Sequence, residues 1–268
     1  IEIAIDLITA IVEIVASMYE SGRKKLPSQL QETITQFLPR AFESLDHDFA
    51  SRILIAWNNL LWLYLTLEVN FFDLPNEPHK KLWEFMNSLP ENNIDVKTGK
   101  LSVTWALLKT IACQDDSHQW LVFFNLQNNS DLAKSIIRNF NEDRANKELS
   151  KEIIIELGQR YCGILSTYAL FPGQIEINRI IGQSILEFLS VPASPLLLIE
   201  FTNSLFEIYG DGDFDYDKPV FVQGGFIKIL EKQVLPNLKS QFKFVDKNQD
   251  PKLRSKCNEC TSTLESFI

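Results

Sequence analysis

The residues with the clearest chemical character in this chain are acidic, and they gather in its C-terminal third. Between Ile180 and Asp217 there are seven acids and no Lys or Arg, whereas Lys218 to Lys256 holds nine basic residues. The acids are Glu187, Glu200, Glu207, Asp211, Asp213, Asp215 and Asp217. Because like charges gathered on one surface raise the local concentration of cations, this segregation predicts a surface that holds a basic partner.

The spacing of three of these acids also suggests calcium. Asp211, Asp213 and Asp215 reproduce the first three ligand positions of an EF-hand loop. Tyr216 then stands where the turn needs Gly, and Val222 stands where a bidentate Glu is needed. The departures favour an acidic loop open to Lys or Arg over a calcium site, so we expect no metal and no cofactor.

Other reactive side chains form no recognisable catalytic group. Cys257 and Cys260 have the spacing of a zinc or redox pair, but no second pair or His follows them. Within a helix they would share one face, which favours packing. His47, His79 and His118 are predicted to be turn or cap residues between helices. No Gly-rich phosphate loop occurs in a strand–loop–helix setting. The sequence therefore predicts a protein that is not an enzyme.

Composition and net charge exclude further classes of protein. The net charge of −9 argues against a general nucleic-acid binder, and the four scattered cysteines favour reduced, intracellular thiols. Ile53 to Phe72 has the length of a membrane span, yet it contains Asn58, Asn59, Glu68 and Asn70, so a buried helix is favoured. Because the chain begins inside an apolar periodic run, we expect a fragment of a longer protein.

Helical periodicity dominates the chain, with breaks where Pro, Gly, Asn and Asp cluster. The predicted helices are Glu2–Tyr19, Ser28–Leu45, Asp48–Phe71, Glu77–Leu89, Thr98–Cys113, Ser117–Leu126, Ser130–Asn141, Leu149–Leu170, Gln174–Leu189, Ser194–Tyr209, Pro219–Phe244 and Pro251–Phe267. Pairs of them take about 40 to 50 residues, which is the period of HEAT or armadillo units. We therefore predict an all-α fold, a right-handed α-solenoid of eleven or twelve helices that forms one domain over residues 1–268.

Two helices carry a narrow polar stripe on an otherwise apolar cylinder. One stripe contains Glu2, Asp6 and Glu13, and the other contains Glu200, Asn203 and Glu207. A helix sandwiched between neighbours in an array is expected to show such a stripe, and we expect both stripes to face the concave side. The five tryptophans are expected mostly in the core, with one or two as partner anchors. The candidate partner-binding residues are Glu2, Asp6, Glu13, Asn59, Glu200, Asn203, Glu207, Asp211, Asp213, Asp215 and Asp217.

The C-terminal third also resembles a known family. The run from Ser204 to Asp217, followed by Val220-Phe221, and the segments Leu253–Glu259 and Leu264–Ile268 are similar to the symportin family, as is Trp105–Leu108. The resemblance implies an armadillo/HEAT nuclear-import adaptor that shuttles between cytoplasm and nucleus. Such adaptors escort the two basic ribosomal proteins that bind 5S ribosomal RNA. The family's N-terminal receptor-binding signal and acidic insertion are not found in this sequence.

Two alternatives stay open at this level. A karyopherin-like transport receptor would use the same kind of helical array, and a general interaction scaffold would need no basic cargo. We expect a monomer with no direct DNA contact and no membrane contact. The import receptor is expected to bind through an N-terminal region that this sequence lacks.

Overall fold

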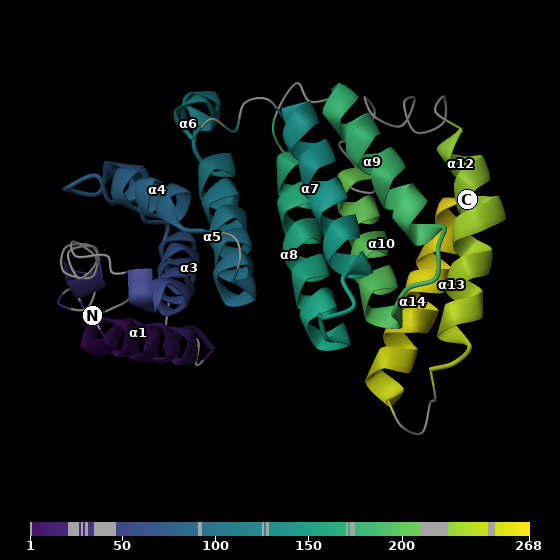
Figure 1. Cartoon of the computed structure of the whole chain (residues 1–268), viewed down its shortest axis with the longest axis horizontal. Coiled ribbons are helices and arrows are strands. Elements are labelled where there is room, and N and C mark those ends of the chain that lie inside the picture. The colour runs from purple at the N-terminus through teal and green to yellow at the C-terminus, as the bar shows by residue number, and fades with distance from the viewer. Residues whose placement is uncertain are drawn as a thin grey trace. The chain divides into compact units, whose positions relative to one another are not determined.

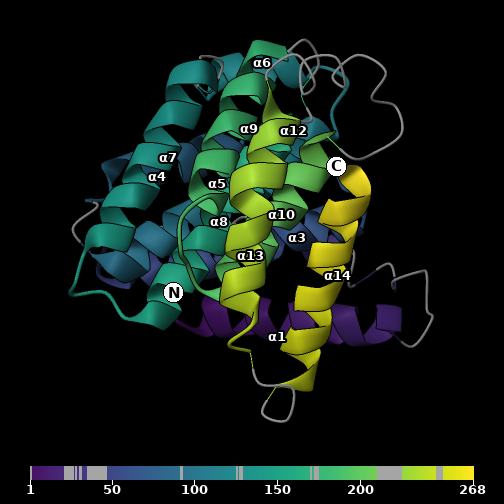
Figure 2. The same cartoon turned by 90° about the vertical axis from the view of Figure 1, so that its right-hand side faces the viewer.

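The structure, a computed structural model, describes most of the chain and divides into two compact units. The described residues are 2–20, 27, 29, 32–34, 47–90, 93–124, 126, 129–169, 171, 175–209, 225–245 and 250–268. The units are Ile1–Trp120 and Leu121–Ile268. Within these ranges every regular element is helical and none is a strand, which confirms the all-α prediction (Figures 1 and 2).

The first unit is built on helix α3, which packs against α1 on one side and α5 on the other. Its elements are α1 (Glu2–Glu20), η3 (His47–Phe49), α3 (Ala50–Thr66), η4 (Phe71–Asp73), α4 (Pro78–Ser88), α5 (Ile94–Ala112) and the start of α6 (Ser117–Phe123). Trp57, Tyr64 and Phe71 are fully buried at the centre. The Tyr64 hydroxyl donates to the Ile34 carbonyl at 3.0 Å, and burial raises the pKa of this phenol.

Helix α1 has apolar side chains on both sides of its predicted polar stripe, and the two sides differ in burial. It buries Ile5, Ile8, Ile11 and Val15, and it contacts α3. Its second apolar side is exposed, with Ile3 at 85%.

The second unit has two layers of helices. Helices α7 (Asn129–Ala145) and α9 (Ile175–Leu189) pack side by side, and so do α8 (Lys151–Ala169) and α10 (Pro195–Tyr209). The C-terminal elements are α12 (Phe226–Ile229), η5 (Leu230–Val234), α13 (Leu235–Phe242) and α14 (Pro251–Phe267). Of these, α12 and η5 contact α9, while α14 packs on α10 and α13 (Figure 2). Helix α9 also contacts α10, and α13 contacts α14, so consecutive helices pack against each other at both places.

Capping residues mark several helix starts. Asn93 accepts hydrogen bonds from the backbone N–H groups of Asp95 and Val96, so α5 begins at Ile94 rather than at Thr98 as predicted. Asp250 accepts from Leu253 N at 2.8 Å ahead of Pro251, which confirms the predicted start of α14.

Two of the longer predicted helices also differ from the structure. The helix expected to reach Phe71 ends at Thr66, where Glu68 adopts a left-handed conformation with φ 55°. Val69 N then bonds Tyr64 O and Glu68 N bonds Leu65 O, which is the Schellman arrangement that closes a helix. The helix expected over Pro219–Phe244 is described from Phe226 and contains the π-helical turn η5.

Pro236 accounts for that turn. A proline within a helical run lacks an N–H donor and its ring clashes with the carbonyl four residues earlier. The π-helical turn over Leu230–Val234 relieves this conflict just before the proline. The helix predicted over Ser28–Leu45 lies mostly outside the described residues.

Two side-chain predictions are wrong. His79 lies inside α4 rather than in a link, and its ring is buried against the rings of Phe71, Phe72 and Trp120. Of the five tryptophans only Trp57 is fully buried, whereas the other four are partly exposed at the ends or flanks of helices. Aromatic rings on helix flanks satisfy the apolar period without entering the core.

Within the described residues, every helix is too short or too polar to cross a bilayer. The handedness of the predicted solenoid and its single-domain organisation stay predictions.

Candidate partner-binding site

Helix α10 carries two of the predicted partner-binding residues on its outward side. Ser194 Oγ accepts from Leu197 N at 3.4 Å, and Pro195 follows as the first helical residue, so the chain turns sharply into α10. The apolar side of the helix is buried against its neighbours. Glu200 is half-buried and Asn203 is exposed, which places both at the edge facing α14.

A polar hollow of about 190 Å³ lies between α10 and α14. Glu200 and Asn203 line it from α10, and Lys256, Glu259 and Thr263 line it from α14. Gln159 on α8 donates its amide Nε2 to Glu200 Oε1 at 3.5 Å, which orients that carboxylate. The hollow therefore combines two carboxylates, one ammonium, one amide and one hydroxyl from two neighbouring helices.

These groups suit recognition of a cation. A Lys or Arg side chain entering the hollow would meet the Glu200 and Glu259 carboxylates and the Asn203 amide oxygen. Lys256 opposes such a ligand because it carries the same charge at the same rim. Cys260 also lines the hollow, and burial raises the pKa of its thiol to about 11. A neutral, buried thiol is a poor nucleophile.

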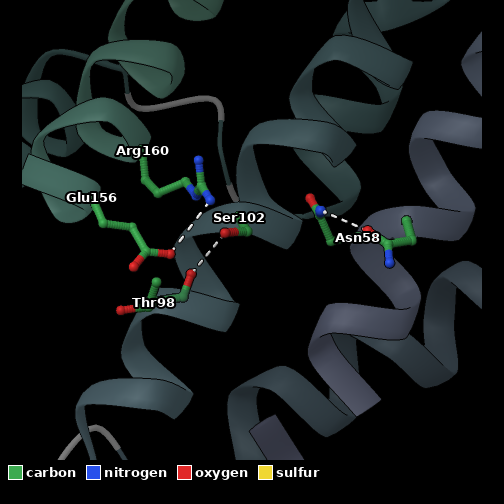
Figure 3. Close-up of polar contacts among 6 residues, drawn as sticks. Asn58, Thr98, Ser102, Glu156 and Arg160 are labelled. Carbon is green, nitrogen blue, oxygen red and sulfur yellow. Dashed lines mark hydrogen bonds and ion pairs between the residues drawn. The ribbon is translucent and has the colours of Figure 1, made fainter. Parts of the chain in front are cut away.

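A second polar surface lies on α3 and α5 in the first unit. Asn58 Nδ2 donates to Asn59 Oδ1 at 3.5 Å, as Figure 3 shows, and both amides are half-buried. Asn58 lies one helical turn before Trp62, whose ring meets that of Trp105 edge-on at 5.5 Å. Trp105 Nε1 is buried and has no hydrogen-bond partner among the described residues.

This amide–aromatic surface has its own chemistry. Indole faces attract ammonium and guanidinium groups, and neighbouring amides can bond an extended backbone. On α5, Ser102 Oγ donates to the Thr98 carbonyl within the helix, so its proton is already engaged (Figure 3).

A separate ion pair lies on α8 of the second unit, where Arg160 pairs with Glu156 at 3.5 Å (Figure 3).

The other predicted residues are placed differently. Asp6 forms an exposed ion pair with Arg52 of α3 at 3.2 Å, and Glu13 is exposed farther along α1. Glu2 and Glu207 belong to α1 and α10, but their side chains lie outside the described residues, as do Asp211, Asp213, Asp215 and Asp217 entirely. The structure thus brings Glu200 and Asn203 together, and whether the stripes converge stays a prediction.

Sequence reasoning missed the contribution of α14 to the hollow. Lys256, Glu259 and Thr263 recur at spacings of three and four and therefore share one face of a helix. That period was visible in the sequence, but the packing of this face against Glu200 was not. Cys257 and Cys260 are both buried in α14, as the packing interpretation predicts.

Comparison with known proteins decides the family. A family model described as SYO1-like, TPR repeats, matches residues 56–268, which is most of the chain. The chain belongs to this SYO1-like repeat family. The match to the family model includes both of the surfaces described above, since Asn58 and Glu259 both fall within the matched residues.

Three relatives show the same relationship. The chain is 45% identical over its whole length to Synchronized import protein 1 of Saccharomyces cerevisiae, covering 43% of that protein. It is 27% identical over 89% of its length to Symportin 1 of Chaetomium thermophilum, covering 37% of that protein. A Schizosaccharomyces pombe protein, described as an armadillo repeat protein involved in nucleocytoplasmic transport, is 37% identical over 97 residues, 36% of this chain. The chain therefore spans less than half the length of these relatives.

Proposed function

We propose that this chain is part of a non-enzymatic adaptor that holds basic ribosomal proteins of the 5S ribonucleoprotein for joint import into the nucleus. The observation that carries the proposal is the hollow between α10 and α14, where Glu200 and Glu259 face one small space. The membership in the SYO1-like family and the names of the relatives support an import role.

Basic ribosomal proteins suit the acidic hollow chemically. Ribosomal proteins present Lys and Arg side chains that would otherwise meet RNA phosphates, and a complementary carboxylate surface captures such side chains quickly. The net charge of −9 adds a long-range attraction toward the same partners. The Trp62–Trp105 pair offers a second place where a cationic side chain can bind, through the aromatic ring faces.

The test is a titration of the 268-residue chain with labelled basic N-terminal segments of the two 5S-RNA-binding ribosomal proteins, at low and at physiological salt. We expect the double variant Glu200→Lys, Glu259→Lys to weaken binding about tenfold or more, because two half-exposed charge pairs are each converted into repulsion. Lys256→Ala should strengthen binding, because it removes the cation that α14 places at the hollow.

A matched control separates this site from the overall charge. Glu148→Lys with Glu231→Lys makes the same change in net charge at two exposed positions outside the hollow. Equal weakening by both double variants would show that the hollow is not the binding site. Trp62→Leu tests the amide–aromatic surface separately, and loss of binding in that variant alone would move the cargo site to the first unit.

A further inference from the structure

The second unit contains a hydrophobic groove that the proposed function does not use. It lies between α7 and α9, has a volume of about 250 Å³, and is lined by aromatic and aliphatic side chains. Its wall is a packed set of rings in which Phe188 stacks on Phe201 at 4.0 Å and Phe201 stacks on Phe140 at 5.4 Å. A flat aromatic wall of this kind favours an inserted aromatic or large aliphatic side chain.

The groove continues into a shallower hollow along α7. Ile137, Asn141 and Ser184 belong to both parts, and Lys134 and Ala145 extend the shallow part along the helix. Asn141 is exposed, and Ser184 Oγ donates to the Ile180 carbonyl, which leaves the hydroxyl oxygen able to accept. Polar groups along an apolar groove that continues beside a helix suit the backbone of a peptide segment better than a compact small molecule.

The charges at the rim set the preferred sequence of that segment. The guanidinium of Arg144 lies over the ring of Phe188 at 5.2 Å from its centroid. Among the described residues no carboxylate forms an ion pair with Arg144. Its acidic neighbours are engaged elsewhere, since Asp143 accepts from Tyr161 Oη at 2.9 Å, and Glu142 pairs with Arg138.

The remaining acid of the groove is Glu187. It lines the groove from α9 and accepts a hydrogen bond from Gln183 Nε2 at 3.3 Å. An acidic ligand is therefore attracted by Arg144 and opposed by Glu187, and the stacked guanidinium is the stronger feature because its N–H edge remains available for a carboxylate.

We propose that the groove between α7 and α9 binds a short segment of a partner protein in which an aromatic side chain lies next to an acidic one. The aromatic side chain lies in the groove against the rings of Phe140 and Phe188, which contact each other at 5.5 Å, and the carboxylate pairs with Arg144. This preference is opposite in charge to that of the hollow between α10 and α14, so the two sites select different partners.

The experiment uses the intact 268-residue chain, labelled with ¹⁵N, and a synthetic peptide, acetyl-Ser-Asp-Phe-Glu-Ser-amide. We expect chemical-shift changes at Asn141, Ser184 and Val191, with a dissociation constant on the order of 0.1 to 1 mM for a single anchored side chain. Acetyl-Ser-Lys-Phe-Lys-Ser-amide and acetyl-Ser-Asp-Ala-Glu-Ser-amide serve as controls, and both should bind at least about fivefold more weakly.

Three variants test the residues. Arg144→Gln should weaken the acidic peptide about fivefold, whereas the exposed Lys147→Gln on the following turn should leave binding unchanged. Glu187→Gln should strengthen binding. Ser184→Tyr, which fills the groove from its edge, should abolish the shift changes in a chain whose melting temperature is retained.

Some results would overturn the proposal. It fails if the lysine-flanked peptide binds as tightly as the acidic one, or if the acidic peptide perturbs α10 and α14 instead of the groove. The hollow is tested by the titration with basic ribosomal segments and by its own variants, so the two proposals are decided by different experiments.

Discussion

At the scale of single residues, His79 shows how burial changes chemistry. Its ring lies against Phe71, Phe72 and Trp120, and burial lowers its pKa below the ordinary value, although Glu77 opposes the shift. The unfolded chain therefore takes up a proton near pH 6.5, whereas the folded chain does so only at lower pH. The stability contributed by neutral His79 is complete above about pH 6.5 and is lost as the pH falls below that value.

The prediction concerns the slope of stability against pH. Between pH 7.5 and 5.5 the free energy of unfolding should fall more steeply in the unaltered chain than in His79→Phe, as measured by urea denaturation. The exposed His118 provides the control, and His118→Gln should keep the original slope. Parallel slopes for the unaltered chain and His79→Phe would contradict the assignment.

Single residues also show where sequence reasoning stops. Trp62 and Trp105 stand at apolar positions of their helices, which predicts burial. Both rings are nevertheless only half-buried, and they meet between α3 and α5. The hydrophobic period of a sequence predicts only that a ring lies on the apolar side of its helix. Whether a second helix fully covers that flank depends on contacts between residues far apart in the chain.

At the scale of helices, glycine sets how closely α8 approaches its neighbours. A Cβ at Gly158 would lie 2.2 Å from Leu197 Cδ2 of α10 and 3.3 Å from Phe140 Cζ of α7. Gly158 therefore permits a contact that a larger residue excludes. The close packing of α8 on α10 positions Gln159, the next residue, to donate to Glu200.

Gly158→Ala should destabilise the chain by about 1 to 3 kcal/mol, although alanine is the better helix former. The measurement is a double-mutant cycle with Leu197→Ala, followed by chemical denaturation. Because Leu197 supplies the clashing atom, the double variant should be more stable than the sum of the two single effects predicts. Additive effects would show that the clash is relieved elsewhere.

Helix ends divide into those that are visible in the sequence and those that are not. Asn93, Ser194 and Asp250 are side-chain caps of the expected types at their helix starts. The end of α3 depends on Glu68 in a left-handed conformation, where Gly is the usual residue. A Glu in that position carries no local signal, so the prediction extended the helix to Phe71.

At the scale of the whole molecule, charge governs how partners arrive. The net charge of −9 attracts basic proteins over a distance set by the ionic strength. In the function proposed above, the hollow between α10 and α14 governs how long they stay, since it holds carboxylates at short range. Association and dissociation rates should therefore respond to different substitutions.

Stopped-flow measurements with the basic ribosomal segments would separate the two effects. Raising salt should slow association in the unaltered chain, and both double variants, Glu200→Lys with Glu259→Lys and Glu148→Lys with Glu231→Lys, should reduce that dependence similarly. Only the variant in the hollow should speed dissociation. A change in dissociation rate from the Glu148 and Glu231 substitutions would place short-range contacts outside the hollow.

The sequence by itself determined the helical class, the order and most bounds of the helices, the segregation of charge and the resemblance to the import adaptors. These properties follow from local period, capping chemistry and composition, which act over a few residues. The tertiary structure alone decided that Glu200 and Glu259 line the same hollow, that Asp6 pairs with Arg52 instead, and that α7 and α9 leave an aromatic groove. Each of these depends on which helix faces meet, and this is set by side-chain packing between segments distant in the chain.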